Sequence, residues 1–296
     1  MNNEFWAELS GVKKRFGKTV ALDGLDLQVR RGELFSVLGP NGAGKSTAIS
    51  LLLGLLQPDA GTARLFGRSP SLVEPRRHVG VMMQEVTLAP ELRVHEHIAL
   101  VASFYPSPLS PTEAMELANI TALASRPYGK LSAGQKRQVQ FAMAICGRPK
   151  LLFLDEPSVG LDVRARENMW GALRRVVANG ASIVLTTHYL EEAESLSNRV
   201  AVLNKGRLIA SGTVNEIRAL VVRKHITCST VLAADQIAAW PDVESVTREQ
   251  QRLQISTSNS EAVVRRLLAA DSNLQELEVR RAGLAEAFTE LTQEAA

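Results

Sequence analysis

The chain has 296 residues, with 34 lysines and arginines against 31 aspartates and glutamates, a formal net charge of +3, 45% apolar residues and 22% charged residues. This composition is typical of a globular protein with a sizeable core and excludes a disordered chain, a collagen-like repeat and a disulfide-stapled mini-protein. The small net charge gives no reason to expect a nucleic-acid partner, and the length predicts one large or two modest domains.

Cysteine usage and hydropathy bear on the compartment. The two cysteines, Cys146 and Cys228, are too few for a disulfide framework and favour buried thiols in a reducing compartment. The most apolar stretch, Leu51–Leu56, is interrupted by Gly54 and is far shorter than the ~20 residues of a membrane-spanning helix. The N-terminal sequence MNNEFWAELS lacks the basic start and apolar centre of a signal peptide. We therefore expect a cytoplasmic protein that reaches a membrane only through another polypeptide.

The first part of the chain predicts strands that alternate with helices. Residues 5–31 alternate in short stretches, and Leu25, Leu27 and Val29 show the period of two that marks a half-buried strand. Apolar runs typical of buried central strands lie at 34–38, 151–154 and 182–186. Helical patterns lie at 47–56, 135–146 and 163–179. This alternation predicts an α/β fold with a parallel sheet that is covered on both faces.

Between these segments, residues 86–130 are mostly helical in composition. Ser110 is a predicted helix N-cap, because Pro111 suits the first helical position and Glu113 completes a capping box. We therefore expect a helical region inserted between the strands of the sheet.

A change of composition near residue 219 predicts two domains, 1–218 and 219–296. The second domain has the predicted order βαββαβ of a small ferredoxin-like α+β domain, and Leu284, Phe288 and Leu291 then mark a final amphipathic helix. Its predicted elements are strands at 226–231 and 274–280, a hairpin at 243–257, and helices at 233–240 and 258–270, the latter opened by a capping box from Ser258 to Glu261.

The strongest motif follows the pattern G-x-x-x-x-G-K-[ST] of a phosphate-binding loop and lies between a predicted strand and a predicted helix. Its glycines let backbone N–H groups turn towards phosphates, and the helix N-terminus adds positive potential. Lys45 is expected to reach the β- and γ-phosphates, and the Ser46 hydroxyl to bind Mg²⁺. The loop comprises Gly39, Pro40, Asn41, Gly42, Ala43, Gly44, Lys45 and Ser46, followed by Thr47, which is placed to donate to the α-phosphate.

A pair of carboxylates ends the predicted strand at 151–154. In a phosphate-loop fold a carboxylate at this strand end holds Mg²⁺, normally through water, and this role falls to Asp155. The next carboxylate, Glu156, is placed to accept a proton from the attacking water. In isolation such a pair is often a solvated strand end, but the upstream loop favours the catalytic interpretation.

A second predicted anion site lies at the sequence LSAGQ, residues 131–135. Ser132 and Gln135 form a capping box at a helix start, and the small residues Ala133 and Gly134 between them leave the free N–H groups exposed. Because one ATP does not need two such sites, two chains facing head to tail would each lend one to the other's nucleotide.

These motifs, in this order, resemble the ATP-binding cassette family, the nucleotide-binding subunits of ABC transporters, over residues 5–218. The resemblance implies a phosphate-loop NTPase cassette with a RecA-like core, an antiparallel β subdomain and an α-helical subdomain at about 85–150. It also implies ATP hydrolysis, with ATP and Mg²⁺ as ligands. Asp155 and Glu156 match the family's Walker B pair, and LSAGQ matches its signature, normally LSGGQ.

Further family positions have matches in this sequence. Gln84 matches the Q-loop glutamine that contacts Mg²⁺ and the attacking water, and His188 matches the switch histidine that senses the γ-phosphate. Phe16 takes the place of the aromatic residue that stacks on adenine, and SVGLD, ending in Asp162, matches the D-loop. Ala133 replaces a signature glycine, which implies slower hydrolysis or, alternatively, a degenerate site. The remaining histidines have no partners at metal-ligand spacing and are interpreted as structural: His78, His95, His97 and His225.

Several segments are similar to ATPases of ABC-2 type drug and antibiotic exporters. The resemblance implies a bacterial exporter subunit that forms an ATP-sandwich homodimer and docks, through the groove behind Gln84, on a separate ABC-2 type permease at the cytoplasmic face of the membrane. The C-terminal domain would regulate or stabilise the dimer. The segments are LRVHEHI within Gln84–Ala99, TTHYLEEAE at 186–194, NKGRLIASGT at 204–213 and the C-terminal GLAEAFTELT.

Other functions stay open at this point. An importer ATPase would carry the same motifs. A cassette acting in translation normally has two cassettes in one chain, and one acting in DNA repair has a long coiled coil where this chain has only the interval from Thr47 to Leu131. A module that holds ATP without turnover would not need Glu156. The transported substrate is not encoded in this chain, since its contacts belong to the permease.

Overall fold

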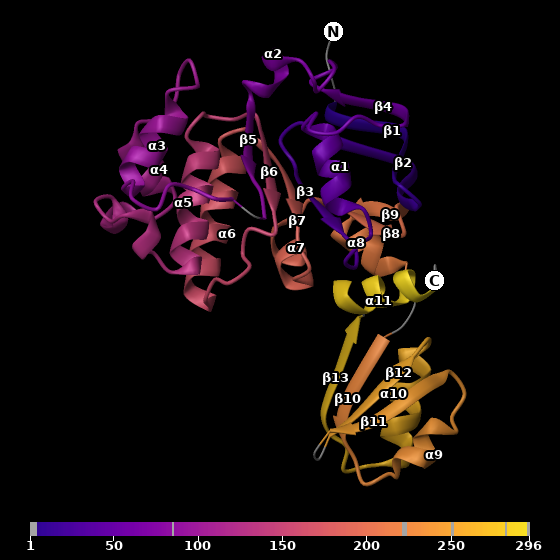
Figure 1. Cartoon of the computed structure of the whole chain (residues 1–296). Coiled ribbons are helices and arrows are strands. Elements are labelled where there is room, and N and C mark those ends of the chain that lie inside the picture. Colours follow the sequence, from indigo (N-terminus) through magenta and orange to yellow (C-terminus); the bar gives the residue numbers. More distant parts are fainter. Residues whose placement is uncertain (1–4, 85, 221–223, 250–251, 282, 295–296) are drawn as a thin grey trace. The chain divides into compact units, whose positions relative to one another are not determined.

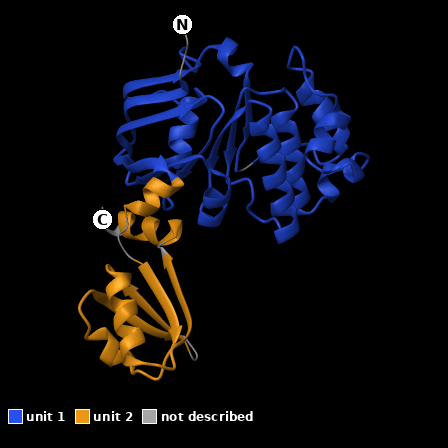
Figure 2. Cartoon of the chain, turned by 180° about the vertical axis from the view of Figure 1, so that it is seen from behind, with its two compact units in different colours: residues 1–213, 295 blue, residues 214–294, 296 orange. Residues whose placement is uncertain are grey.

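Figure 1 shows the computed structural model of the chain, which describes residues 5–84, 86–220, 224–249, 252–281 and 283–294. The chain divides into two compact units, Met1–Thr213 and Val214–Glu294, which Figure 2 colours separately. The division falls where strand β9 ends and helix α8 begins.

The centre of the first unit is a six-stranded sheet in the order β5-β6-β7-β3-β8-β9. Its neighbours pair in parallel from β5 to β8, which confirms the predicted parallel sheet, and β9 adds an antiparallel edge beside β8. The strands are β3 (Leu34–Leu38), β5 (Val79–Met82), β6 (Leu151–Asp155), β7 (Ser182–Thr186), β8 (Arg199–Asn204) and β9 (Arg207–Thr213).

Both faces of this sheet are buried, because successive residues of a strand point to opposite faces. Along β6, Leu152 and Leu154 belong to one apolar core, whereas Leu151 and Phe153 belong to the core on the other face. This is why the central strands are continuous apolar runs. The first face is covered by α5 (Ala133–Ile145) and α6 (Val163–Ala178), and the second by α1 (Lys45–Leu52) (Figure 1).

A second, three-stranded antiparallel sheet packs on the far side of α1, in the order β2-β1-β4. Leu25, Leu27 and Val29 are buried and the polar residues between them are exposed, which confirms the predicted half-buried strand. Its strands are β1 (Phe5–Phe16), β2 (Thr19–Arg30) and β4 (Ala60–Leu65).

The region predicted as mostly helical contains less regular helix than its composition indicates. Helix α3 (Val94–Ala102) and helix α4 (Pro111–Leu117) are separated by a loop that contains Pro106 and Pro108, which cannot continue a helix. The capping box of α4 is confirmed, since the Ser110 hydroxyl accepts from the Glu113 N–H at 3.2 Å. The remaining short helices of this unit are α2 (Val73–Arg76), the 3₁₀ turns Thr121–Leu123 and Tyr128–Lys130, and α7 (Leu190–Leu196).

The second unit has a four-stranded antiparallel sheet in the order β11-β12-β10-β13 and its own core, which includes Ile226, Leu253 and Leu267. Its order β-α-β-β-α-β is that of a ferredoxin-like arrangement. Residues 250 and 251, at the predicted hairpin turn, lie outside the described residues. The elements are α8 (Val214–Ala219), β10 (Lys224–Ser229), α9 (Ala234–Ala238), β11 (Val243–Glu249), β12 (Arg252–Thr257), α10 (Ser260–Ala270), β13 (Gln275–Arg281) and α11 (Leu284–Glu294).

The predicted capping box from Ser258 to Glu261 is wrong by one residue. Helix α10 begins at Ser260, and its N-cap is Asn259, whose Oδ1 accepts from the Ala262 N–H at 3.2 Å. The Glu261 carboxylate instead pairs with the ammonium of Lys224 on β10. Sequence alone could not choose between the adjacent residues, because serine and asparagine are both good N-caps.

Both cysteines are free thiols and buried, as predicted. Burial raises the pKa of the Cys146 thiol to about 11. Among the described residues, no helix is both long and apolar enough to cross a membrane.

Candidate nucleotide site

The predicted phosphate loop connects the central strand β3 to helix α1. Gly42 and Gly44 adopt φ values of 80° and 102°, in the left-handed region that favours glycine. A Cβ atom on Gly44 would also lie 2.6 Å from Leu22 Cδ2 and 2.7 Å from the Ala21 carbonyl oxygen. Glycine at position 44 is therefore required both by its backbone conformation and by the close approach of β2.

Lys45 places a buried ammonium group at this loop. Its side chain donates to the carbonyl oxygens of Gly39 at 2.7 Å and Pro40 at 3.1 Å. Burial lowers the pKa of Lys45, and the nearby charges of Glu156 and Asp155 oppose that shift. In the structure, the Lys45 ammonium thus donates to carbonyl groups of the loop itself. Phosphate oxygens of a bound nucleotide can take the place of these carbonyl acceptors.

Asp155 ends strand β6 beside the first turn of α1. Its carboxylate is buried, accepts a hydrogen bond from the Thr186 hydroxyl, and has Oδ2 3.4 Å from Ser46 Oγ. Residues 46 and 155 are distant in sequence, but the parallel pairing of the strands brings the ends of β3 and β6 to the same edge of the sheet. The Ser46 hydroxyl and the Asp155 carboxylate therefore lie side by side and place two oxygen atoms at one position.

The three residues predicted to be catalytic lie together: Gln84 and His188 both contact the carboxylate of Glu156. Its Oε2 accepts from Gln84 Nε2 at 3.3 Å, and its Oε1 lies 3.3 Å from His188 Nδ1. They follow β5, β6 and β7, which are neighbours in the sheet, so their C-terminal ends lie side by side. This is the edge at which parallel α/β sheets bind ligands.

The segment 131–135 starts helix α5 as predicted. The Ser132 hydroxyl accepts from the Gln135 N–H at 3.2 Å, and Gln135 Oε1 accepts from the Ser132 N–H at 3.1 Å. A Cβ atom on Gly134 would lie 3.3 Å from both Gly160 O and Leu161 Cδ2. Among the described residues, no hydrogen bond joins this segment to the phosphate loop of the same chain.

Other predicted site residues occupy simpler positions. Phe16 ends β1 with an exposed side chain, and the Lys14 ammonium lies 5.7 Å from its ring centroid. Asp162 is the N-cap of α6, where Oδ1 accepts from the Ala165 N–H at 2.8 Å. His97, interpreted as structural and not as a site residue, is buried and bonded to the Ala89 carbonyl at 2.9 Å.

Sequence analysis missed Arg137, which lies on α5 just after the capping box. Its side chain is buried, with 8% of the residue's surface exposed, and its guanidinium donates to the carbonyl oxygens of Met83 at 2.9 Å, Gln84 at 3.0 Å and Asp155 at 3.1 Å. A helical periodicity could have revealed it, because Arg137 shares the buried face of α5 with Phe141.

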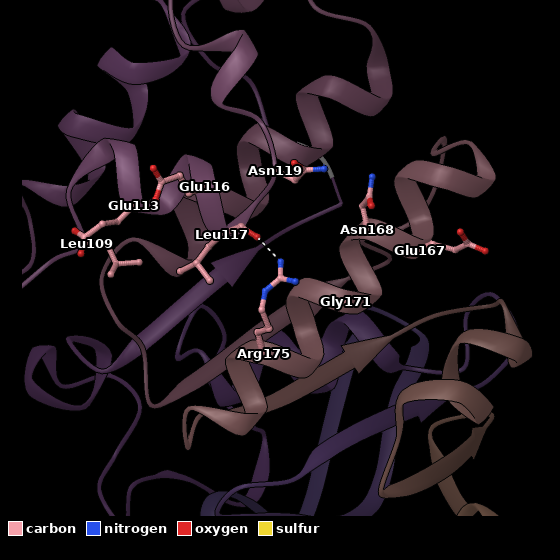
Figure 3. A pocket seen from close by; sticks show the side chains of 9 residues that line it. All are labelled: Leu109, Glu113, Glu116, Leu117, Asn119, Glu167, Asn168, Gly171 and Arg175. Atoms are coloured by element: carbon pink, nitrogen blue, oxygen red, sulfur yellow. Dashed lines mark hydrogen bonds between the residues drawn. The ribbon is translucent and has the colours of Figure 1, made fainter.

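A separate cavity of about 660 Å³ lies between α4 and α6 and is shown in Figure 3. Arg175 donates across it to the Leu117 carbonyl oxygen at 3.1 Å. The residues that line it include Glu113, Glu116 and Glu167 but none of the predicted nucleotide-site residues.

These features together define a phosphate-loop nucleotide hydrolase. They are a glycine-rich loop between a parallel strand and a helix, a lysine in that loop, and a carboxylate at the end of a nearby strand. The family model described as "ABC transporter" matches residues 22–159. The chain is 37% identical over 230 residues to Nod factor export ATP-binding protein I of Ralstonia nicotianae, covering 75% of this chain and 70% of that protein. It is 39% identical over 227 residues to the protein of the same name from Burkholderia thailandensis, covering 74% of this chain and 73% of that one.

Solved structures agree with these relatives. An ATP-binding subunit of an ABC transporter superposes with a TM-score of 0.67 and 29% identity, covering 73% of this chain and 92% of that one. A dimeric ATP-binding cassette in a post-hydrolysis state, bound to ADP and Pi, superposes with a TM-score of 0.64 and 25% identity, covering 70% of this chain and 98% of that one. The chain belongs to the ATP-binding subunits of ABC transporters. It is an ATPase with the ABC cassette fold.

Proposed function

We propose that the chain powers export, as the ATPase of an ABC-2 type exporter that works as an ATP-sandwich homodimer under a separate permease. The export direction is supported by relatives that are named Nod factor export ATP-binding proteins. The dimer is supported by a solved relative that is dimeric, and by an anion-binding helix start at Ser132 that is not bonded to the phosphate loop of its own chain among the described residues.

The observation that carries the hydrolytic part of the proposal is the convergence of Gln84 and His188 on Glu156. In that role Glu156 accepts a proton from the attacking water, Gln84 orients that water, and His188 senses the γ-phosphate. A general base of this kind contributes typically ~10²–10⁴-fold to a rate. Both neighbours lie close enough to hold the carboxylate in place before substrate arrives.

The nucleotide itself would bind along the loop and β1. The loop from Gly39 to Thr47 would surround the phosphates with the backbone N–H groups that all of its residues except Pro40 possess. Lys45 would lie at the β- and γ-phosphates, and the exposed ring of Phe16 would stack on adenine. The partner's nucleotide would meet residues of the signature and D-loop motifs. These are Ser132, Ala133, Gly134, Gln135 and Asp162.

The residues present fit Mg²⁺. The ion prefers oxygen ligands and is usually held by one or two carboxylates together with substrate phosphates, and Ser46 Oγ and Asp155 Oδ2 lie 3.4 Å apart. Ser46, Asp155 and Gln84 would hold the ion, Ser46 directly and Asp155 through water. When bound, Mg²⁺ neutralises charge that develops on the β- and γ-phosphate oxygens.

The permease would hold the chain at the cytoplasmic face of the membrane, docked at the groove behind Gln84. The second unit, from Val214 onwards, would regulate or stabilise the dimer.

Co-expression of the full-length chain with the permease encoded in the neighbouring reading frame tests the proposal, with membrane sedimentation as the measurement. We expect the chain to sediment with membranes only when that permease is present, and inverted vesicles to accumulate the permease's substrate when ATP is added outside. Loss of substrate from the vesicles would instead identify an importer.

A further inference from the structure

The guanidinium of Arg137 joins three segments of the candidate site. Arg137 lies on α5, two residues after the signature segment, and donates to backbone carbonyls at the ends of both β5 and β6. One of its donors, Nη1, bonds to both Met83 O and Gln84 O, whereas Nη2 bonds to both Asp155 O and Glu156 O. The side chain therefore clamps the backbone on which Gln84 and Glu156 are mounted.

This arrangement uses properties that are specific to arginine. A buried cation is costly unless its donors are satisfied, and here backbone carbonyl oxygens accept from both Nη1 and Nη2. The rigid, planar fork of a guanidinium reaches two neighbouring backbone segments at once, which a lysine ammonium on its flexible stem does not do equally well. The Gln140 side chain completes the set, since its Oε1 accepts from Nη1 at 3.1 Å.

The clamp acts on a backbone that needs support. Glu156 has φ 50°, a left-handed conformation that is uncommon for a residue with a side chain. Its N–H is held by Thr186 O at 3.0 Å, and its carbonyl oxygen is held by Arg137. The peptide groups on both sides of the Glu156 Cα atom are thus fixed, and so is the direction of the carboxylate.

We propose that Arg137 is a positioning residue for ATP hydrolysis, which sets the backbone of Glu156 and Gln84 from the helix that begins with the signature segment. Arg137, Gln84, Ala133 and Gly160 also line a common cavity of about 460 Å³, so that the signature helix, the Q-loop and the D-loop adjoin at this side chain. A displacement of the signature segment by the partner's nucleotide would therefore move the hydrolytic residues of its own site. The inference rests on the proposed catalytic role of Glu156.

A double-mutant cycle of the full-length chain tests this role. We expect Arg137→Met to lower kcat for ATP by about 10–100-fold, because small misplacements of catalytic groups have effects of that size, while the Kd for ATP stays within about twofold. In the Glu156→Gln background, Arg137→Met should change the residual rate by less than about twofold, since the group that it positions is already absent. Arg137→Lys should give an intermediate kcat, because it keeps the charge but not the fork.

The matched control is Arg175→Met, which removes an arginine-to-carbonyl bond between α6 and Leu117, away from the nucleotide site. We expect it to leave kcat unchanged. An unchanged kcat in Arg137→Met would overturn the inference, as would an equal loss of rate in the parent and in the Glu156→Gln background. If Arg137→Met does not fold, the double-mutant cycle is measured with Arg137→Lys in its place, and the same two results would overturn the inference. A Glu156→Gln variant that turns over like the parent would instead show that the proposed base itself is wrong.

Discussion

At the residue scale, Glu156 has a strained backbone conformation that hydrogen bonds to its peptide groups hold in place. A left-handed conformation of a residue with a side chain costs on the order of 1–3 kcal/mol and persists only where the surroundings impose it. Hydrogen bonds from Arg137 and to Thr186 impose it here. The conformation turns the carboxylate away from the strand, so that it meets Gln84 and His188 at the sheet edge.

The proposed mechanism assigns catalysis and nucleotide binding to two different residues, Glu156 and Lys45. Replacing Glu156 by glutamine keeps the size of the side chain but removes the base, so we expect turnover to fall ~10²–10⁴-fold while ATP affinity barely changes. Replacing Lys45 by alanine removes a charged group that contacts the phosphates before reaction, and we expect ATP binding itself to be lost. Steady-state ATPase rates and nucleotide titrations of both variants make the comparison. An equal loss of affinity in the two variants would contradict this division of roles.

At the scale of the element, helix α5 connects the signature segment, through Arg137, with the backbone of the proposed hydrolytic residues Gln84 and Glu156. Its first turn is held by the reciprocal bonds of Ser132 and Gln135, and a cap of this kind stabilises a helix by about 1 kcal/mol. Gly134 packs against the D-loop segment so closely that even a methyl group would lie 3.3 Å from Gly160 O. At the helix start, Gly134 is therefore closely packed, whereas Ser132 and Ala133 are exposed to solvent.

Substitutions in the signature segment should separate these effects. We expect Ala133→Gly to leave the ATPase rate equal or modestly higher, because the N–H donors belong to the backbone and survive the change. Gly134→Asp should abolish turnover, since a carboxylate there repels the partner's γ-phosphate and crowds Gly160. Gly134→Ala is the control for crowding alone and should lose less activity. The ATPase rates are measured with the membrane partner present. Parent-like hydrolysis by Gly134→Asp would exclude a composite site.

For the whole molecule, the proposed division of each nucleotide site between two chains bears on assembly. If each nucleotide needs the phosphate loop of one chain and the signature segment of another, dimerisation depends on ATP. The solved dimeric relative with ADP and Pi has the same cassette fold. The second unit has its own sheet and its own core.

The dimer should be trapped when ATP binds but is not hydrolysed. We expect full-length Glu156→Gln to sediment as a dimer with Mg-ATP and as a monomer without it, whereas Lys45→Ala should stay monomeric in both conditions because it does not retain nucleotide. Analytical ultracentrifugation over a range of protein concentrations is the measurement. A monomer of Glu156→Gln at high concentration with Mg-ATP, also in the presence of the permease, would argue against the sandwich dimer.

The sequence by itself determined the parts of this protein that depend on local pattern. The buried strands, the phosphate loop and the capping boxes at Ser110 and Ser132 follow from apolar runs, glycine spacing and side-chain-to-backbone hydrogen bonds within a few residues of one another. The motif order was enough to indicate the family. The predicted cap was wrong by one residue because Ser258 and Asn259 are both good N-caps. The predicted helix content of 86–130 was too high because composition alone does not show that Pro106 and Pro108 interrupt the region.

Only the tertiary structure decided which distant groups meet. The contact of Ser46 with Asp155 and the convergence of Gln84 and His188 on Glu156 come from the strand order of the sheet, which no local pattern specifies. Helical periodicity places Arg137 on the buried face of α5, but its role could not be predicted: its partners are backbone carbonyls, which every residue possesses, so no residue type in the sequence marks them. Long-range pairing of parallel strands, rather than side-chain chemistry alone, builds the site.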